Sequence, residues 1–561
     1  MPGWSSRPVV YPAPADAVGP PFPPVPTELD FGVCMAPSIS VIVRFHNEIT
    51  HIGAVFRAVR AQRTSHGVEI VAVDNASTDG SREFAEEYAD QLIDIDDYRP
   101  GFALNRAVET ARGDTVVIVS AHAVPEHDRW LANLTADTER DDVLGVYGAQ
   151  VYPLHAKFLD KCDLDIFSDP RPRREVADTD FWNANSAFRR AFWERCPFDE
   201  DVIELEDHHW TKRQLPDPAL AIHFEPTAAV YHYGHEARND RAFLEPSELT
   251  DAQRIARARR VLESPDETWP TVMRAGMDLA ALPGHPDVRG AVPALCRQLA
   301  EHPDFDVRWR MAGALGRIAD PAALPFLVRG LEDRSFYARD ECAWSLGRFG
   351  AAAVPALLAA ADRVAAEHRP FLALALGLTG APEGATAAID LVRASLAEGG
   401  DTERTAIYFL GEFARDVSDD LLEAVADRLA SENAMTARAA AWCWGVLAAG
   451  RGRPGRGLGA VAALAAGHPE ATVRSEAVVA LGRIARSERG EDRIADLGAA
   501  LRDDAGRVRQ AAMQSLRLAV ESGGTQAGLI AEAHPLDPDF GVNFERELAV
   551  AALRKDQGET Q

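Results

Sequence analysis

The chain has 561 residues, more than one hydrophobic core usually serves, so two or three domains are expected. A formal net charge of −27 at pH 7 argues against a protein that binds nucleic acid or an anionic membrane through a basic surface. Apolar residues make up 47% of the chain, yet no apolar run reaches the ~18–20 residues that a transmembrane helix needs.

Residues 1–36 are predicted to form an extended arm, because the first 26 residues contain nine prolines and lack the basic and apolar regions of a secretory signal. Six cysteines are scattered along the chain without a CxxC pair. This scattered distribution of cysteines favours reduced thiols in a cytoplasmic protein over a disulfide framework or a zinc site.

Residues 37–262 alternate β-rich runs with helical segments. In chain order we expect strands at Ser38–Val43, Glu69–Val73, Leu92–Ile95 and Thr115–Val119, and helices at Thr50–Arg63, Ser81–Tyr88 and Gly101–Ala111. This alternation predicts a parallel, doubly wound α/β sheet. Ligands bind such sheets beyond the carboxyl ends of the strands, so Ser120 and His122, which follow the fourth strand, are expected to point into a site.

Seven sequence motifs follow one another between Val41 and His235. They read VIVRFHNE, VAVDNASTDGS, GFALNRAVETARGD, VVIVSAHAVP, NANSAFRRAFWERCPFDE, LEDHHW and VYHYGH. In this order they resemble the inverting glycosyltransferases of family 2. The resemblance implies a GT-A fold (α/β, Rossmann-like, with a mostly parallel sheet) and the transfer of a sugar from a nucleoside-diphosphate sugar to an acceptor.

The resemblance also implies roles for residues at the strand ends. Glu48 and Asp74 would bind the nucleotide base and ribose, since carboxylates accept hydrogen bonds from base N–H groups and ribose hydroxyls. Arg99 and Asn105 would lie near the diphosphate. Ordinary loop capping is the alternative for the two carboxylates, and a surface charge is the alternative for Arg99. The predicted nucleotide-binding residues are Arg44, Glu48, Asp74, Arg99, Asn105 and Ser120.

The metal-binding turn of the family, normally Asp-x-Asp, reads Ser120-Ala121-His122 here. Carboxylates suit Mg²⁺, whereas imidazole suits softer first-row ions. The resemblance places His232 or His235 where a further metal ligand would lie. Either these histidines hold Mn²⁺ or Mg²⁺ across the diphosphate, or His122 contacts the diphosphate without a metal. An ordinary turn residue is the third interpretation of His122.

Inversion at the anomeric carbon needs a base that takes the proton of the acceptor hydroxyl. By its match to the family's acidic pair, Asp207 would be that base, and Glu206 would orient it or contact the acceptor. Adjacent carboxylates resist joint ionisation, which raises one pKa. The alternative is a helix N-terminus that merely carries acids. Trp182, Asn183, Asn185 and Trp210 are predicted to contact sugar, with core packing as the alternative for both tryptophans.

Residues 263–285 are a predicted connector, and an Ala/Leu/Arg-rich helical pattern then repeats over residues 286–525. The repeated arginines are Arg308, Arg339, Arg369, Arg404, Arg438, Arg474 and Arg509, at steps of 30 to 36 residues. This period predicts an all-α solenoid, and the pattern resembles HEAT repeats. We expect the arginines to bond the neighbouring turn rather than to bind a ligand. Residues 526–561 are a predicted last helix and tail.

The favoured function is a cytoplasmic, inverting glycosyltransferase with an acceptor held partly by the solenoid. The acceptor is a peptide or protein, a glycan or a natural product, and the solenoid could instead hold a protein partner. The alternative is a HEAT-repeat scaffold whose N-terminal domain has lost catalysis, as the altered Ser120-Ala121-His122 turn suggests. A nucleotidyltransferase fits poorly, because no Gly-rich, Lys-bearing loop follows the first strand.

Overall fold

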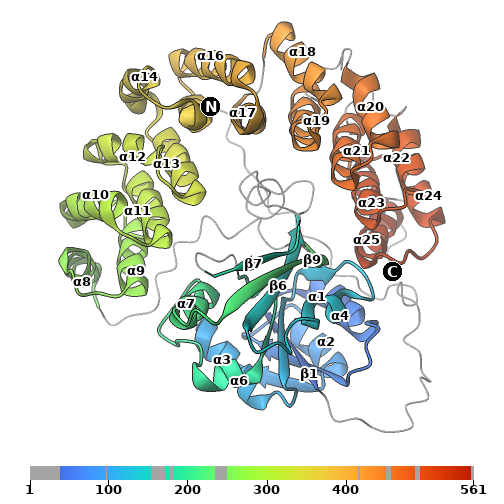
Figure 1. Ribbon diagram of the computed structural model, residues 1–561. Helices are drawn as coiled ribbons and strands as arrows, with labels where there is room; N and C mark the ends of the chain where they lie inside the picture. Colours follow the sequence, from blue (N-terminus) through green and yellow to red (C-terminus); the bar gives the residue numbers. More distant parts are fainter. Residues whose placement is uncertain are drawn as a thin grey trace. The chain divides into compact units, whose positions relative to one another are not determined.

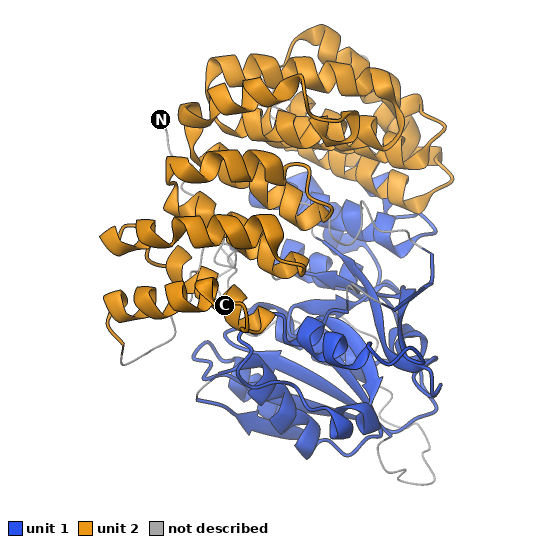
Figure 2. Ribbon diagram, turned by 60° about the vertical axis from the view of Figure 1, so that its left-hand side comes forward, with its two compact units in different colours: residues 1–236, 497–561 blue, residues 237–496 orange. Residues whose placement is uncertain are grey.

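The computed structural model describes residues 38–96, 98–152, 171–176, 181–233, 249–414, 417–449, 457–486 and 493–556. The chain divides into two compact units, shown in different colours in Figure 2. Unit 1 comprises residues 1–236 and 497–561, and unit 2 comprises residues 237–496. The last helices of the chain thus fall in the same unit as the N-terminal domain. The predicted arm, residues 1–36, lies outside the described residues.

A mixed β-sheet forms the centre of unit 1. Its strands are β1 (Ile39–Phe45), β2 (Val68–Asp74), β3 (Gln91–Asp94), β4 (Thr115–Ser120), β5 (Ala123–Pro125), β6 (Val143–Val151), β7 (Arg173–Glu175), β8 (Asn185–Arg189) and β9 (Ala221–His232). Their order is β3-β2-β1-β4-β8-β6-β9-β5, with β7 paired to β9. β1 pairs in parallel with β2 and β4, whereas β8 runs antiparallel to β4 and β6. The predicted α/β class and the four expected strands are confirmed, but the sheet is mixed rather than mostly parallel.

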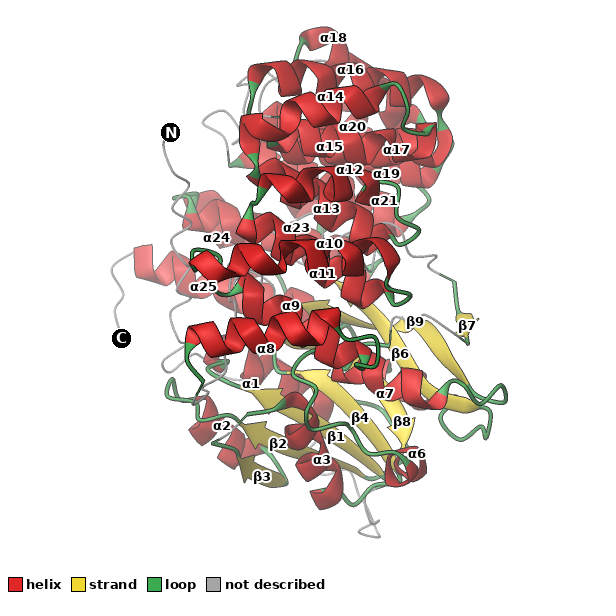
Figure 3. Ribbon diagram, turned by 90° about the vertical axis from the view of Figure 1, so that its left-hand side faces the viewer, coloured by secondary structure: helices red, strands yellow, loops and turns green. Residues whose placement is uncertain are grey.

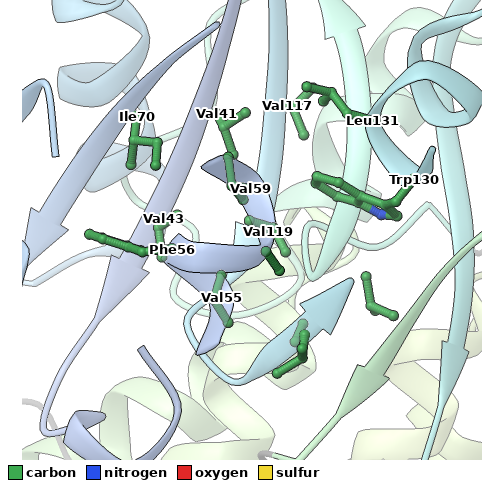
Figure 4. Close-up of a cluster of buried hydrophobic side chains, with 14 of the residues drawn as sticks. Val41, Val43, Val55, Phe56, Val59, Ile70, Val117, Val119, Trp130 and Leu131 are labelled. Atoms are coloured by element: carbon green, nitrogen blue, oxygen red, sulfur yellow. The ribbon is translucent and has the colours of Figure 1, made fainter. Parts of the chain in front are cut away.

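The central strands are apolar on both faces, which is why they form a buried sheet. In β1, Val41 and Val43 face the hydrophobic cluster drawn in Figure 4, while Ile42 faces a second cluster on the opposite side. Helices cover both faces. The helices of unit 1 are α1 (Ile49–Arg60), α2 (Ser81–Tyr88), α3 (Pro100–Thr110), α4 (Trp130–Thr135), α6 (Arg190–Arg195), α7 (Glu206–Gln214), α23 (Gly506–Glu521), α24 (Thr525–Ala533) and α25 (Phe540–Asp556).

Unit 2 is all helical, as Figure 3 shows, and this confirms the predicted all-α array. Its helices are α8 (Asp251–Glu263), α9 (Trp269–Ala280), α10 (Val292–Glu301), α11 (Phe305–Ile318), α12 (Leu324–Gly330), α13 (Phe336–Arg348), α14 (Val354–Ala361), α15 (Arg369–Leu378), α16 (Pro382–Glu398), α17 (Gly400–Phe413), α18 (Asp419–Asp427), α19 (Ala434–Ala449), α20 (Gly457–Gly467) and α21 (Ala471–Ala485); α22 (Ile494–Ala500) crosses into unit 1. Helices α11, α13, α15, α17, α19 and α21 pack on one another in succession, and each also packs on the helix before it (Figure 1).

Four of the seven repeated arginines, Arg308, Arg339, Arg474 and Arg509, donate to backbone carbonyls of the turn before their own helix, as predicted. Arg308 forms two hydrogen bonds with Asp333, at 2.7 and 2.9 Å, and donates to the carbonyl oxygens of His302 and Pro303. Arg474 donates in the same way to the carbonyl of His468 at 2.7 Å. These arginines therefore tie each helix to the loop before it.

No single helix of the described residues is both long and apolar enough to cross a membrane, although the bent pair α13 and Gly350–Ala361 passes by length and composition. The four cysteines that the structure describes, Cys196, Cys296, Cys342 and Cys443, form no disulfide.

Candidate active site

Three strand ends bring predicted site residues to one edge of the sheet. In the parallel pairing of β1 with β4, Arg44 lies opposite Ser120. In the pairing of β1 with β2, Phe45 lies opposite Asp74. Asp74 is buried, and both of its carboxylate oxygens lie 3.2 Å from the backbone nitrogen of Ser77 in the following loop. The strand register thus supplies the common edge that the sequence predicted for these residues.

The acidic pair stands at the first turn of α7. Leu205, which precedes the helix, has a φ of 59°, a left-handed conformation that is unfavourable for leucine. Glu206 and Asp207 follow it and are both buried. Asp207 accepts hydrogen bonds from the backbone nitrogens of Asn183, at 2.8 Å, and His208, at 2.9 Å. Burial and the adjacent Glu206 charge raise the pKa of Asp207 to about 6, although these two N–H groups oppose the rise.

Arg44 joins the acidic pair to the end of β1. Its Nη2 lies 3.0 Å from Oε1 of Glu206, and both side chains are largely shielded from water. The same Glu206 oxygen accepts from the side-chain nitrogen of Asn183 at 3.4 Å. The backbone nitrogen of Ser120 donates to the carbonyl of Ala184, next to Asn183. Arg44, Ser120, Asn183 and the acidic pair therefore form one connected cluster.

Glu48 is held between two imidazoles. Its Oε1 lies 2.8 Å from Nδ1 of His122, and its Oε2 lies 3.2 Å from Nδ1 of His51. Burial acts to raise the pKa of Glu48, but the hydrogen bonds and charge attraction of His122 and His51 outweigh it and lower that pKa to about 2. The carboxylate therefore stays charged at neutral pH and accepts hydrogen bonds from both rings.

His122 also lies beside His232. Their ring centroids are 4.8 Å apart, and the rings meet edge to face. The arrangement follows from the antiparallel pairing of β5 with β9, in which Ala123 lies opposite His232 and the backbone nitrogen of Tyr233 donates to the carbonyl of His122. Two of the three predicted metal ligands are thus adjacent. The third, His235, lies outside the described residues.

The described side chains do not by themselves form a metal site. Nδ1 of His122 is engaged by Glu48, which leaves one ring nitrogen for another partner. Within the part of the chain that the structure describes, no three His, Cys, Asp or Glu side chains gather as metal ligands. A hard cation such as Mg²⁺ favours several oxygen ligands, which this turn lacks. A metal requirement therefore stays a prediction.

Arg99 and Asn105 lie together around the segment at Glu200. Asn105 donates to the carbonyl of Phe198 at 2.9 Å and to Glu200 at 3.0 Å, and it accepts from the indole of Trp193 at 2.9 Å. Arg99 contacts the carbonyl of Glu200 at 3.4 Å. These contacts anchor the start of α3. These contacts join Arg99 and Asn105 to the segment at Glu200, and their role at a diphosphate stays a prediction.

The two tryptophans have different surroundings. Trp182 is partly exposed, and its ring lies over His208 with centroids 4.6 Å apart. Trp210 is fully buried in the core, where it packs on Phe188 and donates its indole N–H to the carbonyl of Cys196 at 2.7 Å. The predicted sugar stacking does not fit this position of Trp210, because both faces of its ring are covered by core residues.

Asn183 and Asn185 also differ, although only one residue separates them. Asn183 belongs to the cluster of the acidic pair. Asn185 is fully buried in β8, donates to the carbonyls of Ala149 and Ala228, and accepts from the indole of Trp130. Its amide is satisfied inside the domain, so the predicted sugar contact does not fit Asn185. Asn183 lies in the turn that precedes β8, whereas Asn185 is the first residue of that strand, and this difference separates the two side chains.

The sequence analysis did not single out His51, Tyr233 or Phe544. His51 follows Glu48 by three residues at the start of α1, a spacing that places two side chains on one face of a helix. That spacing could have indicated the pair. No local pattern could have indicated Phe544, because its contact with His51 joins residues nearly 500 positions apart in the chain.

Comparison with known proteins identifies similarity in both halves of the chain. Residues 40–199 match the model of glycosyl transferase family 2, and residues 292–369 match the model of HEAT repeats. Glycosyltransferase AglE of Haloferax volcanii is 27% identical over 188 residues, which cover 32% of this chain and 61% of AglE. The putative glycosyltransferase EpsH of Bacillus subtilis is 31% identical over 120 residues, which cover 20% of this chain and 35% of EpsH. The chain thus spans less than two thirds of either relative.

Two solved structures align with parts of this chain. Residues 1–349 of S. aureus TarS, in complex with UDP-GlcNAc, align with 57% of this chain and 92% of that chain, at 15% identity and a TM-score of 0.33. The mannosyltransferase PcManGT of Pyrobaculum calidifontis, in complex with GDP-Man and Mn²⁺, aligns with 54% of this chain and 89% of that chain, at 22% identity and a TM-score of 0.28.

Proposed function

Because the chain carries a glycosyl transferase family 2 domain followed by HEAT repeats, we propose that it transfers a sugar from a nucleoside-diphosphate sugar to an acceptor hydroxyl, with inversion at the anomeric carbon. The two curated relatives are named as glycosyltransferases, which supports sugar transfer. The proposal extends to a donor that binds at the ends of β1, β2 and β4, and to HEAT repeats that hold the acceptor or a protein partner.

The observation that carries this proposal is the raised pKa of the buried Asp207 carboxylate. Burial and the charge of Glu206 raise the pKa of Asp207 to about 6, so the carboxylate is ionised at neutral pH and still basic enough to accept a proton. Two backbone N–H groups fix its orientation. A base with a pKa close to the working pH is what general-base catalysis favours.

The proposed step follows from that placement. A carboxylate oxygen of Asp207 takes the hydroxyl proton of the acceptor while the acceptor oxygen forms a bond to the anomeric carbon. The bond from that carbon to the diphosphate oxygen breaks on the opposite face, and the nucleoside diphosphate leaves with its electron pair. Glu206 pairs with Arg44, and the charge of Glu206 keeps the pKa of Asp207 raised. Glu48, charged through its contacts with His122 and His51, accepts hydrogen bonds from the nucleotide.

The replacement Asp207→Asn tests the proposal. It keeps the size of the side chain and removes the base, so kcat should fall about a thousandfold while the dissociation constant of the nucleotide changes less than about twofold. Donors are first screened by thermal shift with UDP, dTDP and GDP sugars. Calorimetry then measures nucleotide binding, and Asp201→Asn, at an exposed position nearby, is the matched control. Equal losses of turnover and of nucleotide affinity would contradict the role of Asp207 as the base.

A second candidate function is a HEAT-repeat scaffold whose N-terminal domain is catalytically inactive. The absence of a three-ligand metal cluster among the described side chains, together with the Ser120-Ala121-His122 turn, favours this candidate. The same calorimetry separates the two, because a scaffold should bind none of the nucleotides with or without Mn²⁺. The predicted cytoplasmic location is part of the proposal and awaits localisation of the tagged chain.

A further inference from the structure

The last helix of the chain is built into the α/β domain of unit 1 (Figure 2). Phe540 and Phe544 of α25 belong to the same buried hydrophobic cluster as β1, β4 and α1. The backbone nitrogen of Phe540 donates to the carbonyl of Glu126 at 2.9 Å, and the hydroxyl of Tyr231 donates to Asp539 at 2.7 Å. A Cβ added at Gly541 would lie 2.3 Å from the ring of Tyr231. The fit between α25 and the sheet is therefore close at several points.

Three aromatic rings meet where α25 contacts α1. His51 of α1 stacks on Tyr233 with ring centroids 5.6 Å apart, and it meets the ring of Phe544 at 5.7 Å. Tyr233 and Phe544 are themselves 5.0 Å apart, edge to face. The imidazole of His51 is thus packed against two rings, one from Tyr233, which directly follows β9, and one from α25. Such packing limits the orientations that the imidazole can adopt.

The oriented imidazole contacts Glu48. Nδ1 of His51 lies 3.2 Å from Oε2 of Glu48, while His122 holds the other carboxylate oxygen. The contacts therefore run without a break from Phe544 through His51 to Glu48. The carboxylate that the proposed function assigns to the nucleotide has one of its two partners positioned by the C-terminal helix.

Helix α23 in turn fixes α25. Glu545, next to Phe544, is fully buried and pairs with Arg517 at 2.6 Å and with the amide of Gln514 at 2.7 Å. The side-chain amide of Gln510 lies 3.4 Å from the hydroxyl of Tyr233. A buried carboxylate is unfavourable without partners of this kind, so the pairing holds α25 in one register on α23.

We propose that Phe544 and His51 are positioning residues for donor binding, and that the C-terminal helices α23–α25 thereby complete the nucleotide site of the α/β domain. This inference rests on the proposed function only in that Glu48 contacts the nucleotide. It assigns to the end of the helical array a role in donor binding in addition to any role in holding the acceptor.

Two substitutions in the full-length chain test the proposal. Phe544→Ala removes the ring that packs on His51, and His51→Phe keeps an aromatic ring between Tyr233 and Phe544 but cannot donate to Glu48. Each should raise the donor KM and the nucleotide dissociation constant about tenfold or more, the loss expected for one hydrogen bond to a charged group, with acceptor KM unchanged. Phe544→Tyr, which keeps the ring, should restore most of the donor affinity.

Leu553→Ala is the matched control. Leu553 is buried on the same helix and packs on Gly528 of α24. This substitution should lower Tm as much as Phe544→Ala does but leave the donor KM at the wild-type value. If Phe544→Ala and Leu553→Ala raise the donor KM equally, or if His51→Phe has no effect, α25 is only a stabilising element and the proposal is overturned.

A readout without nucleotide separates this inference from the proposed function. Diethyl pyrocarbonate modifies accessible imidazoles, and mass spectrometry can follow the reaction at His51. Phe544→Ala should increase the modification rate of His51 several-fold, about the change expected when a packed ring is uncovered, whereas Leu553→Ala should not. An unchanged rate in Phe544→Ala would refute the positioning of His51. A wild-type chain that binds no nucleotide would instead refute the donor role together with the proposed function.

Discussion

Asp207 makes the pH dependence of the reaction predictable. Because the base acts in its ionised form and its pKa is raised to about 6, kcat/KM should rise with pH through about 6 and level off above it. The charge of Glu206 contributes to the raised pKa, so Glu206→Gln should move the inflection to lower pH. Rate profiles between about pH 4.5 and about 7.5, roughly 1.5 units on each side of the expected inflection, would measure the shift. An inflection that stays in place would mean that Asp207 is not the titrating base.

His122 holds one oxygen of Glu48 and lies against His232. His122→Ala should therefore weaken nucleotide binding about tenfold, because Glu48 loses a charged-group hydrogen bond and its pKa rises toward the ordinary range. Calorimetry in EDTA and again in Mn²⁺ would report whether the imidazole acts through a metal or directly on the diphosphate. The matched control is His66→Ala at an exposed position. Unchanged affinity in both buffers would make the turn purely structural.

At the scale of single residues, the sequence could propose the acidic pair and Glu48 as site residues because motifs specify residue type at strand ends, and their roles stay predictions. It could not separate Asn183 from Asn185 or Trp182 from Trp210. In each pair one side chain lies near the acidic pair and the other in the core, and this depends on how the turn before β8, the strand β8 and the helix α7 pack in the domain. That choice is made by tertiary packing, which a motif does not contain.

At the scale of helices, two helix ends in the array predict changes of opposite sign in the free energy of unfolding. Ala319, which ends α11, has a φ of 52°, whereas Gly350, which follows α13, has a φ of 58°. Glycine adopts this left-handed conformation without the steric penalty of a Cβ. Ala319→Gly should therefore raise the free energy of unfolding by about 1 kcal/mol, and Gly350→Ala should lower it by a similar amount. Urea denaturation would measure both, and a change of the same sign in the two variants would contradict the argument.

The secondary structure of the first domain was predictable because its pattern is simple. Short apolar runs alternate with helical segments, and the expected helix Ser81–Tyr88 is α2 residue for residue. Beyond β4 the prediction lacked strands β5 to β9, among them β8, which runs antiparallel to β4, and β9, which pairs in parallel with β6. Those strands pair with partners far along the chain, so their existence depends on contacts that local sequence does not encode.

For the whole molecule, the repeat pattern predicted a helical array to residue 525, and the helices are present. The pattern could not show that residues 497–556 share a compact unit with the α/β domain. Repeats are recognised by the residues that pack one helix on the next. The face that α25 turns toward the sheet, with Phe540, Gly541 and Phe544, carries no repeat signature.

Because residues 497–561 belong to unit 1, truncation of the helical array should also destabilise the α/β domain. Removal of residues 286–561 would test the role of the repeats only if the α/β domain folded alone, but a chain that ends at residue 496 already loses Phe540 and Phe544 from its core. Each buried phenylalanine contributes about 1.5–3 kcal/mol, a large part of a typical domain's stability. We expect this truncated chain to show a lower Tm and to bind a dye specific for exposed apolar surface. A truncated chain with wild-type Tm would mean that α25 is dispensable for folding.

The discontinuity of unit 1 has a consequence for biosynthesis. The ribosome releases residues 1–236 long before residues 497–561, so the α/β domain waits for about 260 intervening residues before helix α25 is synthesised. Premature termination anywhere in the helical array therefore yields a polypeptide whose Tyr231 and Tyr233 lack their covering helix. Quality-control proteases and chaperones recognise such uncovered apolar surface, so a chain that lacks residues 497–561 is expected to be their substrate.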